Sequence, residues 1–176
     1  MCEIIWYGRG GQGAFTAARL LGVAASFEDR YALSFPTFGP ERRGALVLGF
    51  TKLDDVKILD RSEIAAADFA IVLDESLFSQ TVLERLKPDG ILIINTKDSQ
   101  KFTSIYKNTL CIDATALSLN ILKKPIVNTA LLGAFCAVSN EVGLGALKEA
   151  IKEDMKPSLV EKNIELLEAA YRGAAR

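Results

Sequence analysis

The residues best suited to chemistry form a glycine-rich segment near the amino terminus, Gly8-Arg9-Gly10-Gly11-Gln12-Gly13. Its spacing is G-x-G-x-x-G, and it follows an apolar run that predicts a strand and precedes a segment with helical periodicity. Glycines let the backbone bend and approach a ligand, and amides at a helix amino terminus attract phosphate. The candidate cofactor-binding residues here are Gly8, Gly10, Gly11, Gln12 and Gly13. The alternative interpretation is a tight strand-to-helix turn that only packing requires.

A second candidate segment, residues 35–44, reads FPTFGPERRG. Its prolines and glycines restrict the loop, and Phe35 and Phe38 can anchor it, so that Arg42 and Arg43 are held in place. Fixed guanidinium groups suit the recognition of phosphate or carboxylate. Arg42 and Arg43 are therefore also candidate cofactor-binding residues. The alternative is that Glu41 pairs with one of these arginines in a structural contact at a subunit boundary.

Dinucleotide binding is the first function that the glycine segment suggests. A conventional NAD site also needs an acidic residue about 20 positions further on, at the end of a second strand, to hold the ribose. Glu28 and Asp29 come too early, at the end of the predicted helix, and residues 31–36 contain no carboxylate. The sequence thus disfavours NAD, and a free-standing Rossmann-type nucleotide-binding oxidoreductase is kept as an alternative function.

Several kinds of catalysis are excluded by what the chain lacks. It contains no histidine, the commonest general base and transition-metal ligand, so Ser-His-Asp and Cys-His catalysis are ruled out. Its cysteines, Cys2, Cys111 and Cys136, are too few for a four-thiolate iron–sulfur cluster. Each lies in or beside an apolar run, where free cysteine acts as a small hydrophobic residue. We predict neither a catalytic residue nor a metal site within this chain.

Alternating strands and helices are expected to position the two candidate segments. Apolar runs predict strands at 3–7, 45–51, 69–73, 91–95 and 110–113, and 31–40 is expected to be an ordered loop with a short extended piece. Helices are predicted at 14–27, 76–86, 129–138 and 144–151, with a turn at 88–90. A last helix is expected to begin with a capping box at Ser158 and Glu161. This order predicts one domain over 1–176, an α/β Rossmann-like domain with a mostly parallel open sheet covered by helices.

Composition narrows the function classes further. The formal net charge is -1 and no basic block is present, so a nucleic-acid role is not expected. No apolar stretch approaches the ~20 residues that span a bilayer, and no signal peptide is recognisable. We therefore expect a cytoplasmic protein without a membrane partner. The mean hydropathy of +0.20 fits either an ordinary α/β core or a subunit that hides apolar surface against partners.

Taken together, four segments resemble the γ-subunit of pyruvate and related 2-oxoacid:ferredoxin oxidoreductases. They are GRGGQGAFTAA at 8–18, FPTFGPERRGA at 35–45, CIDATALSLNILKKPIVNTALLGA at 111–134 and KNIELLEAAYRG at 162–173. They occur in the family's order and cover essentially the whole chain. The combination of GGQG, FGPERRG and NTALLGA is far more specific than the glycine spacing alone.

The resemblance implies an enzyme that oxidatively decarboxylates a 2-oxoacid, forms the acyl-CoA and reduces ferredoxin. It implies thiamine diphosphate, Mg²⁺ and [4Fe–4S] clusters elsewhere in a complex with α, β and ferredoxin-like δ subunits, and no cofactor bound by this chain alone. The chain would supply subunit interface and part of the coenzyme A or thiamine diphosphate environment, and it could self-associate when isolated. The loop at 35–45 resembles the pyruvate-type members more than the 2-oxoglutarate-type members.

A purely structural scaffold subunit is the remaining alternative. In the functional interpretation, the glycine turn and the loop with Arg42 and Arg43 are expected to lie on one edge of the sheet. Ligands of open α/β sheets bind outside the carboxyl ends of the strands, and Gly8 follows the first strand at that end.

Overall fold

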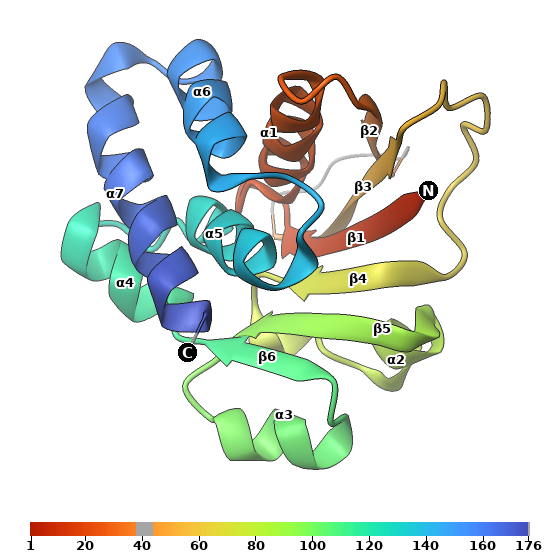
Figure 1. The fold of residues 1–176 in the computed structure, drawn as a ribbon. Coiled ribbons are helices and arrows are strands. Elements are labelled where there is room, and N and C mark those ends of the chain that lie inside the picture. Colours follow the sequence, from red (N-terminus) through yellow and green to blue (C-terminus); the bar gives the residue numbers. More distant parts are fainter. Residues whose placement is uncertain (38–43, 176) are drawn as a thin grey trace.

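Six strands form one sheet in the computed structural model, which describes residues 1–37 and 44–175 (Figure 1). The strands are β1 (Cys2–Arg9), β2 (Tyr31–Pro36), β3 (Leu46–Asp54), β4 (Ala67–Val72), β5 (Leu86–Asn95) and β6 (Thr109–Ile112). Their spatial order is β2-β3-β1-β4-β5-β6. β3 pairs antiparallel with β1 and β2, whereas β1, β4, β5 and β6 pair in parallel. The predicted α/β fold with a mostly parallel sheet is confirmed.

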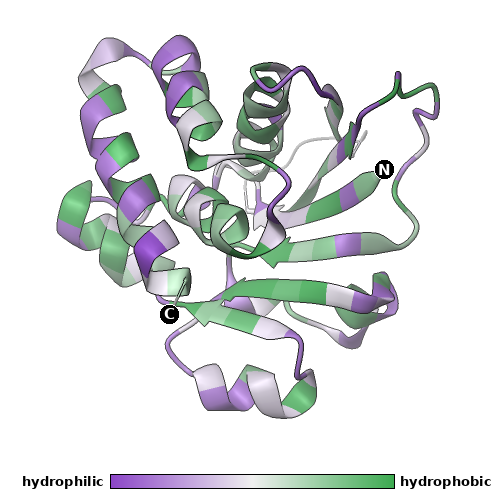
Figure 2. Cartoon of the chain, viewed as in Figure 1, coloured by the Kyte–Doolittle hydropathy of each residue, from purple (hydrophilic) through white to green (hydrophobic). Residues whose placement is uncertain are grey.

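Helices cover both faces of this sheet. The larger cover consists of α1 (Ala14–Ser26), α4 (Ala114–Ile121), α5 (Asn128–Ser139), α6 (Leu144–Asp154) and α7 (Pro157–Ala174). The opposite face is covered by η1 (Glu75–Leu77), α2 (Gln80–Glu84) and α3 (Ser99–Ile105). The strands are largely hydrophobic, whereas the outer helices α6 and α7 carry many hydrophilic residues (Figure 2). Each face of the sheet therefore has its own apolar core.

Helix α5 is the central helix of the larger core. Its residues are buried from Asn128 through Cys136, as its nearly continuous apolar sequence predicts. Two polar residues in this region satisfy each other: Thr129 Oγ1 donates to Asn163 Oδ1 of α7 at 2.9 Å, and Asn163 Nδ2 donates to the Leu159 carbonyl at 2.8 Å. Asn163 thus belongs to the buried face of α7 although it is polar.

Two local predictions were wrong, and the one for residues 31–40 was correct only in its short extended piece. Residues 31–36 form the edge strand β2, where a terminal Pro36 is tolerated because it needs no ladder donor on its free side. The single helix predicted at 76–86 is divided into η1 and α2. Strand β5 already begins at Leu86, before the predicted turn at 88–90, because a register shift between Ala67 and Phe69 of β4 accommodates the turn residues within the strand pair. The capping box does not form, because α7 begins with Pro157 at its first position and Lys156 is its N-cap.

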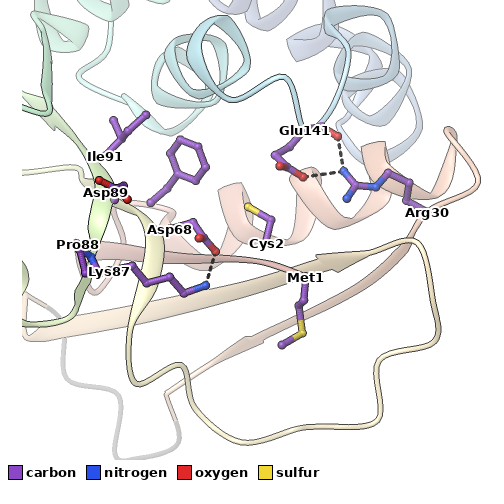
Figure 3. A pocket seen from close by; sticks show the side chains of 11 residues that line it. Met1, Cys2, Arg30, Asp68, Lys87, Pro88, Asp89, Ile91 and Glu141 are labelled. Carbon is purple, nitrogen blue, oxygen red and sulfur yellow. Dashed lines mark hydrogen bonds and ion pairs between the residues drawn. The ribbon is translucent and has the colours of Figure 1, made fainter.

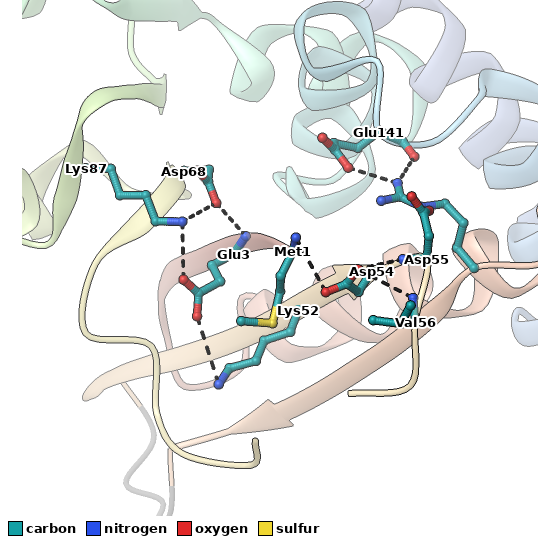
Figure 4. Close-up of polar contacts among 10 residues, drawn as sticks. Met1, Glu3, Lys52, Asp54, Asp55, Val56, Asp68, Lys87 and Glu141 are labelled. Carbon is teal, nitrogen blue, oxygen red and sulfur yellow. Dashed lines mark hydrogen bonds and ion pairs between the residues drawn. The ribbon is translucent and has the colours of Figure 1, made fainter. Parts of the chain in front are cut away.

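Buried charge fixes the segment that follows β3. Lys52 of β3 is only 1% exposed, and its Nζ lies 2.7 Å from Asp60 Oδ2 and 4.0 Å from Glu3 Oε1. Glu3 also pairs with Lys87, which in turn contacts Asp68 (Figure 4). A buried ammonium group without a partner is costly. Lys52 therefore holds residues 55–66 against the smaller core, where Ile64 is buried.

The close approach of α5 and α7 yields a stability prediction. A Cβ on Gly133 would collide with the Leu167 carbonyl oxygen and lie 3.2 Å from Ala170 Cβ. Gly133→Ala should lower the free energy of unfolding by about 1–3 kcal/mol, the usual cost of overfilling a packed contact. As a control, Gly145→Ala in α6 meets nothing within 4 Å and should raise that free energy by up to about 1 kcal/mol, because alanine favours helices. Urea unfolding would measure the free energy of unfolding of each variant. Equal changes in the two variants would contradict a close contact between Gly133 and α7.

The Lys52–Asp60 pair predicts a pH dependence. Hydrogen bonds from the Lys52 ammonium and from Ser62 hold the pKa of Asp60 below its usual range. Because the folded-state pKa is depressed, the carboxylate stabilises the fold above the ordinary pKa of about 4, and this contribution is lost as the pH falls. Asp60→Asn should therefore lower the melting temperature at pH 7, and the difference from the unsubstituted protein should narrow towards pH 3.

The matched control for this pair is Glu149→Gln, because Glu149 pairs with Lys152 on the exposed face of α6. Exposed ion pairs contribute little to stability, so this variant should have the same melting temperature as the unsubstituted protein at pH 7 and at pH 3. If the melting temperatures of Asp60→Asn and the unsubstituted protein differed by the same amount at pH 7 and pH 3, the role given to Asp60 would be rejected.

Candidate functional site

The glycine segment forms the turn between β1 and α1 at the carboxyl edge of the parallel strands (Figure 1). The Gln12 N–H donates to the Arg9 carbonyl at 2.9 Å and closes the turn. Gly11 has a φ of +96° and Gly13 a φ of +83°, which residues with side chains rarely adopt. The predicted strand, turn and helix around this segment are confirmed.

Packing accounts for two of these glycines, whereas Gly11 is required by its backbone conformation alone. A Cβ on Gly8 would lie 2.9 Å from Ala14 Cβ, and a Cβ on Gly13 would lie 2.7 Å from Asn128 Nδ2. A Cβ on Gly11 would meet nothing within 4 Å, so only its backbone conformation requires glycine. The surface beside Gly11 is therefore open to a ligand.

The loop that contains the two arginines starts and returns at this same edge. It joins the end of β2 to the start of β3, and it returns at Gly44 and Ala45. The Gly10 N–H donates to the Ala45 carbonyl at 2.8 Å, and Arg9 Nη1 donates to the Gly44 carbonyl at 3.1 Å. Arg42 and Arg43 themselves lie outside the described residues. The two candidate segments thus meet at their described ends.

A polar network joins the turn to the end of β4. Asp74 Oδ2 accepts from Arg9 Nε at 3.1 Å and from Gln12 Nε2 at 3.2 Å, and Asp74 Oδ1 accepts from the Ser76 N–H at 3.0 Å and its hydroxyl at 2.6 Å. Burial opposes ionisation of Asp74, but these hydrogen bonds outweigh it and hold its pKa below the usual value. Since Arg9 is paired with Asp74, its charge is already compensated within the chain.

The amino terminus of α1 is left without a side-chain cap. Its N-cap is Gly13, and the first-turn amides of a helix have no intrahelical acceptor. At the same edge, the side chains of Asp74, Asp98 and Asp113 cap η1, α3 and α4. The start of α1 therefore offers unfilled N–H donors and the positive end of a helix dipole, which together favour an anion.

A cavity of about 530 Å³ lies beside the turn at the same edge. Its walls include Gln12, the apolar side chains of Leu73 and Val127, and Lys97. Four carboxylates also line it, those of Asp74, Glu75, Asp98 and Asp113. The excess of carboxylates makes this cavity unfavourable for phosphate, so the open amides of the turn are the better anion site.

A larger cavity, of about 610 Å³, lies at the opposite edge of the sheet (Figure 3). Charged side chains on its rim already pair with one another: Arg30 contacts Glu141 at 2.8 Å and Lys87 contacts Asp68 at 2.7 Å. Its apolar wall includes Phe69 and Ile91. None of the predicted site residues that the structure describes lines this cavity, so the glycine turn and the larger cavity are separate features.

The sheet also explains why the turn lacks the partner that NAD requires. In a dinucleotide site, the ribose-binding carboxylate ends the strand next to β1. Here β3 occupies that position but runs antiparallel to β1, so its last residue, Asp54, lies at the opposite edge and pairs with the Met1 amino group at 3.4 Å. The strand that follows α1 in the chain, β2, does end at the carboxyl edge, but its residues 31–36 contain no carboxylate.

The three cysteines do not fit an iron–sulfur cluster. Burial raises the pKa of Cys2 and Cys111, and raises that of Cys136 to about 11, so the thiolate form that binds metal is disfavoured. Within residues 1–37 and 44–175, no three His, Cys, Asp or Glu side chains come together in a way that could hold a metal ion. No helix in those ranges is both long and apolar enough to cross a membrane.

Two residues at the site could not be identified from the sequence pattern. Asp74 reaches the turn from the end of β4, and Asn128 fills the space above Gly13 from the start of α5, with its Nδ2 3.5 Å from the Gly13 carbonyl. Each is more than 60 positions from its partner in the chain. The run of NTALLGA around Asn128 was the one available signal for the second.

Comparison with known proteins gives consistent results. The family model for pyruvate ferredoxin/flavodoxin oxidoreductase matches residues 3–173. The chain is 47% identical over 173 residues to the pyruvate synthase subunit PorC of Methanocaldococcus jannaschii, covering 97% of this chain and 96% of that one. It is 42% identical over 177 residues to the pyruvate/ketoisovalerate oxidoreductases common subunit gamma of Pyrococcus furiosus, with the same coverage.

A solved structure shows the same fold. The crystal structure of pyruvate oxidoreductase subunit PORC from Thermotoga maritima superposes with a TM-score of 0.85 at 34% sequence identity. The similarity covers 97% of this chain and 95% of that one. The α/β fold of this chain is thus shared with that relative over 95% of its length.

The glycine turn generates a further stability prediction. Both Gly11→Ala and Gly13→Ala force a side chain into a left-handed backbone, which costs roughly 1–2 kcal/mol. Gly13→Ala must also displace the Asn128 side chain, whereas Gly11→Ala meets open space. Urea unfolding should therefore show a larger loss of stability for Gly13→Ala. If Gly11→Ala were the more damaging substitution, the surface beside Gly11 would not be open.

Proposed function

The chain belongs to the pyruvate ferredoxin/flavodoxin oxidoreductase family, and we propose that it is the γ-type subunit through which the enzyme binds the anionic groups of coenzyme A. The multi-subunit enzyme oxidatively decarboxylates a 2-oxoacid to acyl-CoA and CO₂ and reduces ferredoxin. This chain is a part of that oxidoreductase and is not expected to be active alone.

One observation carries the coenzyme A proposal: the uncapped amino terminus of α1 lies beside the return of the arginine-containing loop. The first turn of α1 begins at Gly13 without a side-chain cap, and the surface beside Gly11 is open. Gly44 and Ala45 are hydrogen-bonded to the turn. Arg42 and Arg43 immediately precede Gly44 in the sequence, and we propose that their guanidinium groups contact the same anion as the turn. Coenzyme A is the substrate of this reaction with the most phosphate, and arginine suits that anion.

The side chains available in this chain indicate which steps belong to it and which belong to the sibling subunits. Thiamine diphosphate supplies the carbanion chemistry and iron–sulfur clusters carry the electrons, and we place both in the sibling subunits because the thiols of this chain do not fit a cluster. The role of this chain is to hold coenzyme A by its charged end. That arrangement orients the coenzyme A thiol towards the sibling subunit that holds thiamine diphosphate. The entropic cost of bringing the thiol to the acyl group is then met on binding and not during the reaction.

The choice of 2-oxoacid is proposed to lie outside this chain. Pyruvate is the substrate that the loop at 35–45 favours, and the relative from Methanocaldococcus jannaschii is named for pyruvate synthase. The Pyrococcus furiosus relative is named as a common subunit of pyruvate and ketoisovalerate oxidoreductases. A subunit that serves both substrates fits a role on the coenzyme A side of the reaction, which is the same for either one.

The carboxyl edge is also proposed to be the face that meets the sibling subunits, α, β and the ferredoxin-like δ. Obligate interfaces of this kind often bury more than ~2,000 Å² in total. Exposed apolar side chains near the smaller cavity support this placement, because Ile126 and Leu119 are 45% and 48% exposed. Ferredoxin itself would be reached only through the assembled complex.

The test of this function is Arg42→Ala in the assembled enzyme. Loss of a charged hydrogen bond to coenzyme A, worth ~1.5–3 kcal/mol, should raise the KM for coenzyme A roughly ten- to a hundredfold. The reaction of 2-oxoacid with thiamine diphosphate should be almost unaffected. Steady-state kinetics with coenzyme A as the varied substrate measures the first quantity, and single-turnover decarboxylation without coenzyme A measures the second.

Arg61→Ala is the matched control, because Arg61 is exposed in the segment after β3, away from the turn. It should leave the KM for coenzyme A unchanged. A purely structural scaffold role predicts a different result for Arg42→Ala: unchanged coenzyme A kinetics in the surviving complex, together with dissociation of the subunits on a sizing column. That result would withdraw the coenzyme A role.

A further inference from the structure

The Gln12 side chain is held by the protein at both of its polar ends. Its Oε1 accepts from the Arg9 N–H at 2.7 Å, and its Nε2 donates to Asp74 Oδ2 at 3.2 Å. The first contact runs across the turn itself, alongside the backbone hydrogen bond between the same two residues. The second joins the turn to the segment after β4, 62 positions away in the chain. We call the pair of contacts the Gln12–Asp74 bridge.

Only one orientation of the amide satisfies these contacts. A backbone N–H can only donate, and the ionised Asp74 can only accept, so Oε1 must face Arg9 and Nε2 must face Asp74. The depressed pKa of Asp74 keeps it ionised. Both hydrogen-bonding atoms of the Gln12 amide are therefore engaged within the chain, each with one contact.

We infer that Gln12 is a positioning residue, whose bridge to Asp74 fixes the glycine turn so that its backbone amides face the anionic end of coenzyme A. This inference rests on the proposed function. The turn contains three glycines at Gly10, Gly11 and Gly13, and glycine gives the backbone the largest freedom. A rigid contact to the neighbouring strand removes that freedom before the ligand arrives, which is how preorganisation increases affinity.

Asp74, the acceptor in the bridge, also sets the orientation of the Arg9 guanidinium group at this edge. Arg9 is held by the same Asp74 oxygen and by Ser76 Oγ at 2.8 Å, so its guanidinium is turned towards the segment after β4. The anion is then left to the amides of the turn and of α1. A direct role of the Gln12 side chain as a ligand of coenzyme A is the competing explanation, and it requires breaking one of the two contacts.

The experiment exchanges the donor and the acceptor of the bridge in the assembled enzyme. In Gln12→Glu, a second carboxylate faces Asp74 and the two repel each other. In Asp74→Asn, an amide that offers donors faces the Gln12 Nε2 donor or gives up its contacts with Ser76. The double variant restores the pairing with its direction reversed. The amide introduced at position 74 can donate to the carboxylate introduced at position 12, which still accepts from the Arg9 N–H, and the cluster regains its original charge. Arg9 Nε loses the Asp74 oxygen that it shared with Gln12 and keeps its contacts with Ser76 Oγ and the Gly44 carbonyl.

The control for added charge is Gln100→Glu, on the exposed start of α3. It introduces the same carboxylate as Gln12→Glu at a position outside the bridge. Its KM for coenzyme A and its hydrogen exchange in the turn should match those of the unsubstituted enzyme.

Two readouts are needed, the KM for coenzyme A and the rate of amide hydrogen exchange in a peptide that spans residues 8–15. Each single variant should raise the KM about tenfold or more, as expected for a lost charge-assisted hydrogen bond, with a much smaller change in kcat at saturating coenzyme A. Each should also speed exchange in the turn. The double variant should lie closer to the unsubstituted enzyme than either single variant in both readouts.

A double variant no better than the worse single variant would overturn the inference, as would single variants that exchange like the unsubstituted enzyme. If Gln12 were a direct ligand, Asp74→Asn would not repair the KM of Gln12→Glu. Arg42→Ala, measured in the same complex, separates this failure from that of the proposed function. A raised KM in Arg42→Ala with unchanged KM in the bridge variants rejects the bridge alone, whereas unchanged KM in all of them rejects the coenzyme A role as well.

Discussion

The architecture of the site depends on the direction of one strand. β3 lies between β2 and β1 and is antiparallel to both. The connection from β2 to β3 must therefore begin and end at the carboxyl edge of the parallel strands, which is where the glycine turn lies. A parallel β3 would need a crossover of a dozen or more residues and would start at the other edge. The hydrogen bonds of Gly10 and Arg9 to residues 44 and 45 follow from this arrangement.

The two edges of the sheet have different polar chemistry. At the amino edge, Arg30, Lys87 and Lys52 each contact at least two acidic side chains, so the charges there are compensated inside the chain (Figure 4). At the carboxyl edge, aspartates fill the amino termini of η1, α3 and α4, but α1 begins at Gly13 with no side-chain cap. The start of α1 therefore leaves its helix donors uncapped at the glycine turn, as does the neighbouring start of α5, whose N-cap is Val127.

Much of the fold could be predicted because its signals are local. Continuous apolar runs predicted β1, β4, β5 and the buried helix α5, and helical spacing and amphipathicity predicted α1 and α6. The errors occurred where a neighbour decides the local structure. β2 is a strand because it pairs with β3, and β5 starts early because β4 accommodates a bulge. At Pro157 the fixed backbone of proline set the helix start in place of the expected cap.

The candidate site was predictable only in part for the same reason. The glycine turn is contiguous in sequence and follows a strand, so its place at the carboxyl edge could be derived. Asp74 and Asn128 act on it across more than 60 residues, and no spacing rule relates residues that distant. Gln12 was recognised as a member of the segment, but the contacts of its side chain depend on where the end of β4 lies. Arg42 and Arg43 remain predictions.

The antiparallel direction of β3 has a consequence for molecular discrimination. By carrying Asp54 to the far edge, it deprives the glycine turn of the group with which dinucleotide-binding folds read a sugar. What the described part of the turn itself offers is backbone N–H groups, which suit the charge of an anion. If the turn binds coenzyme A as proposed, nicotinamide dinucleotides should compete poorly for it, because no strand beside β1 ends there in a ribose-binding carboxylate. Selectivity among different phosphate esters would then come from the shape of the sibling-subunit surface that faces the turn.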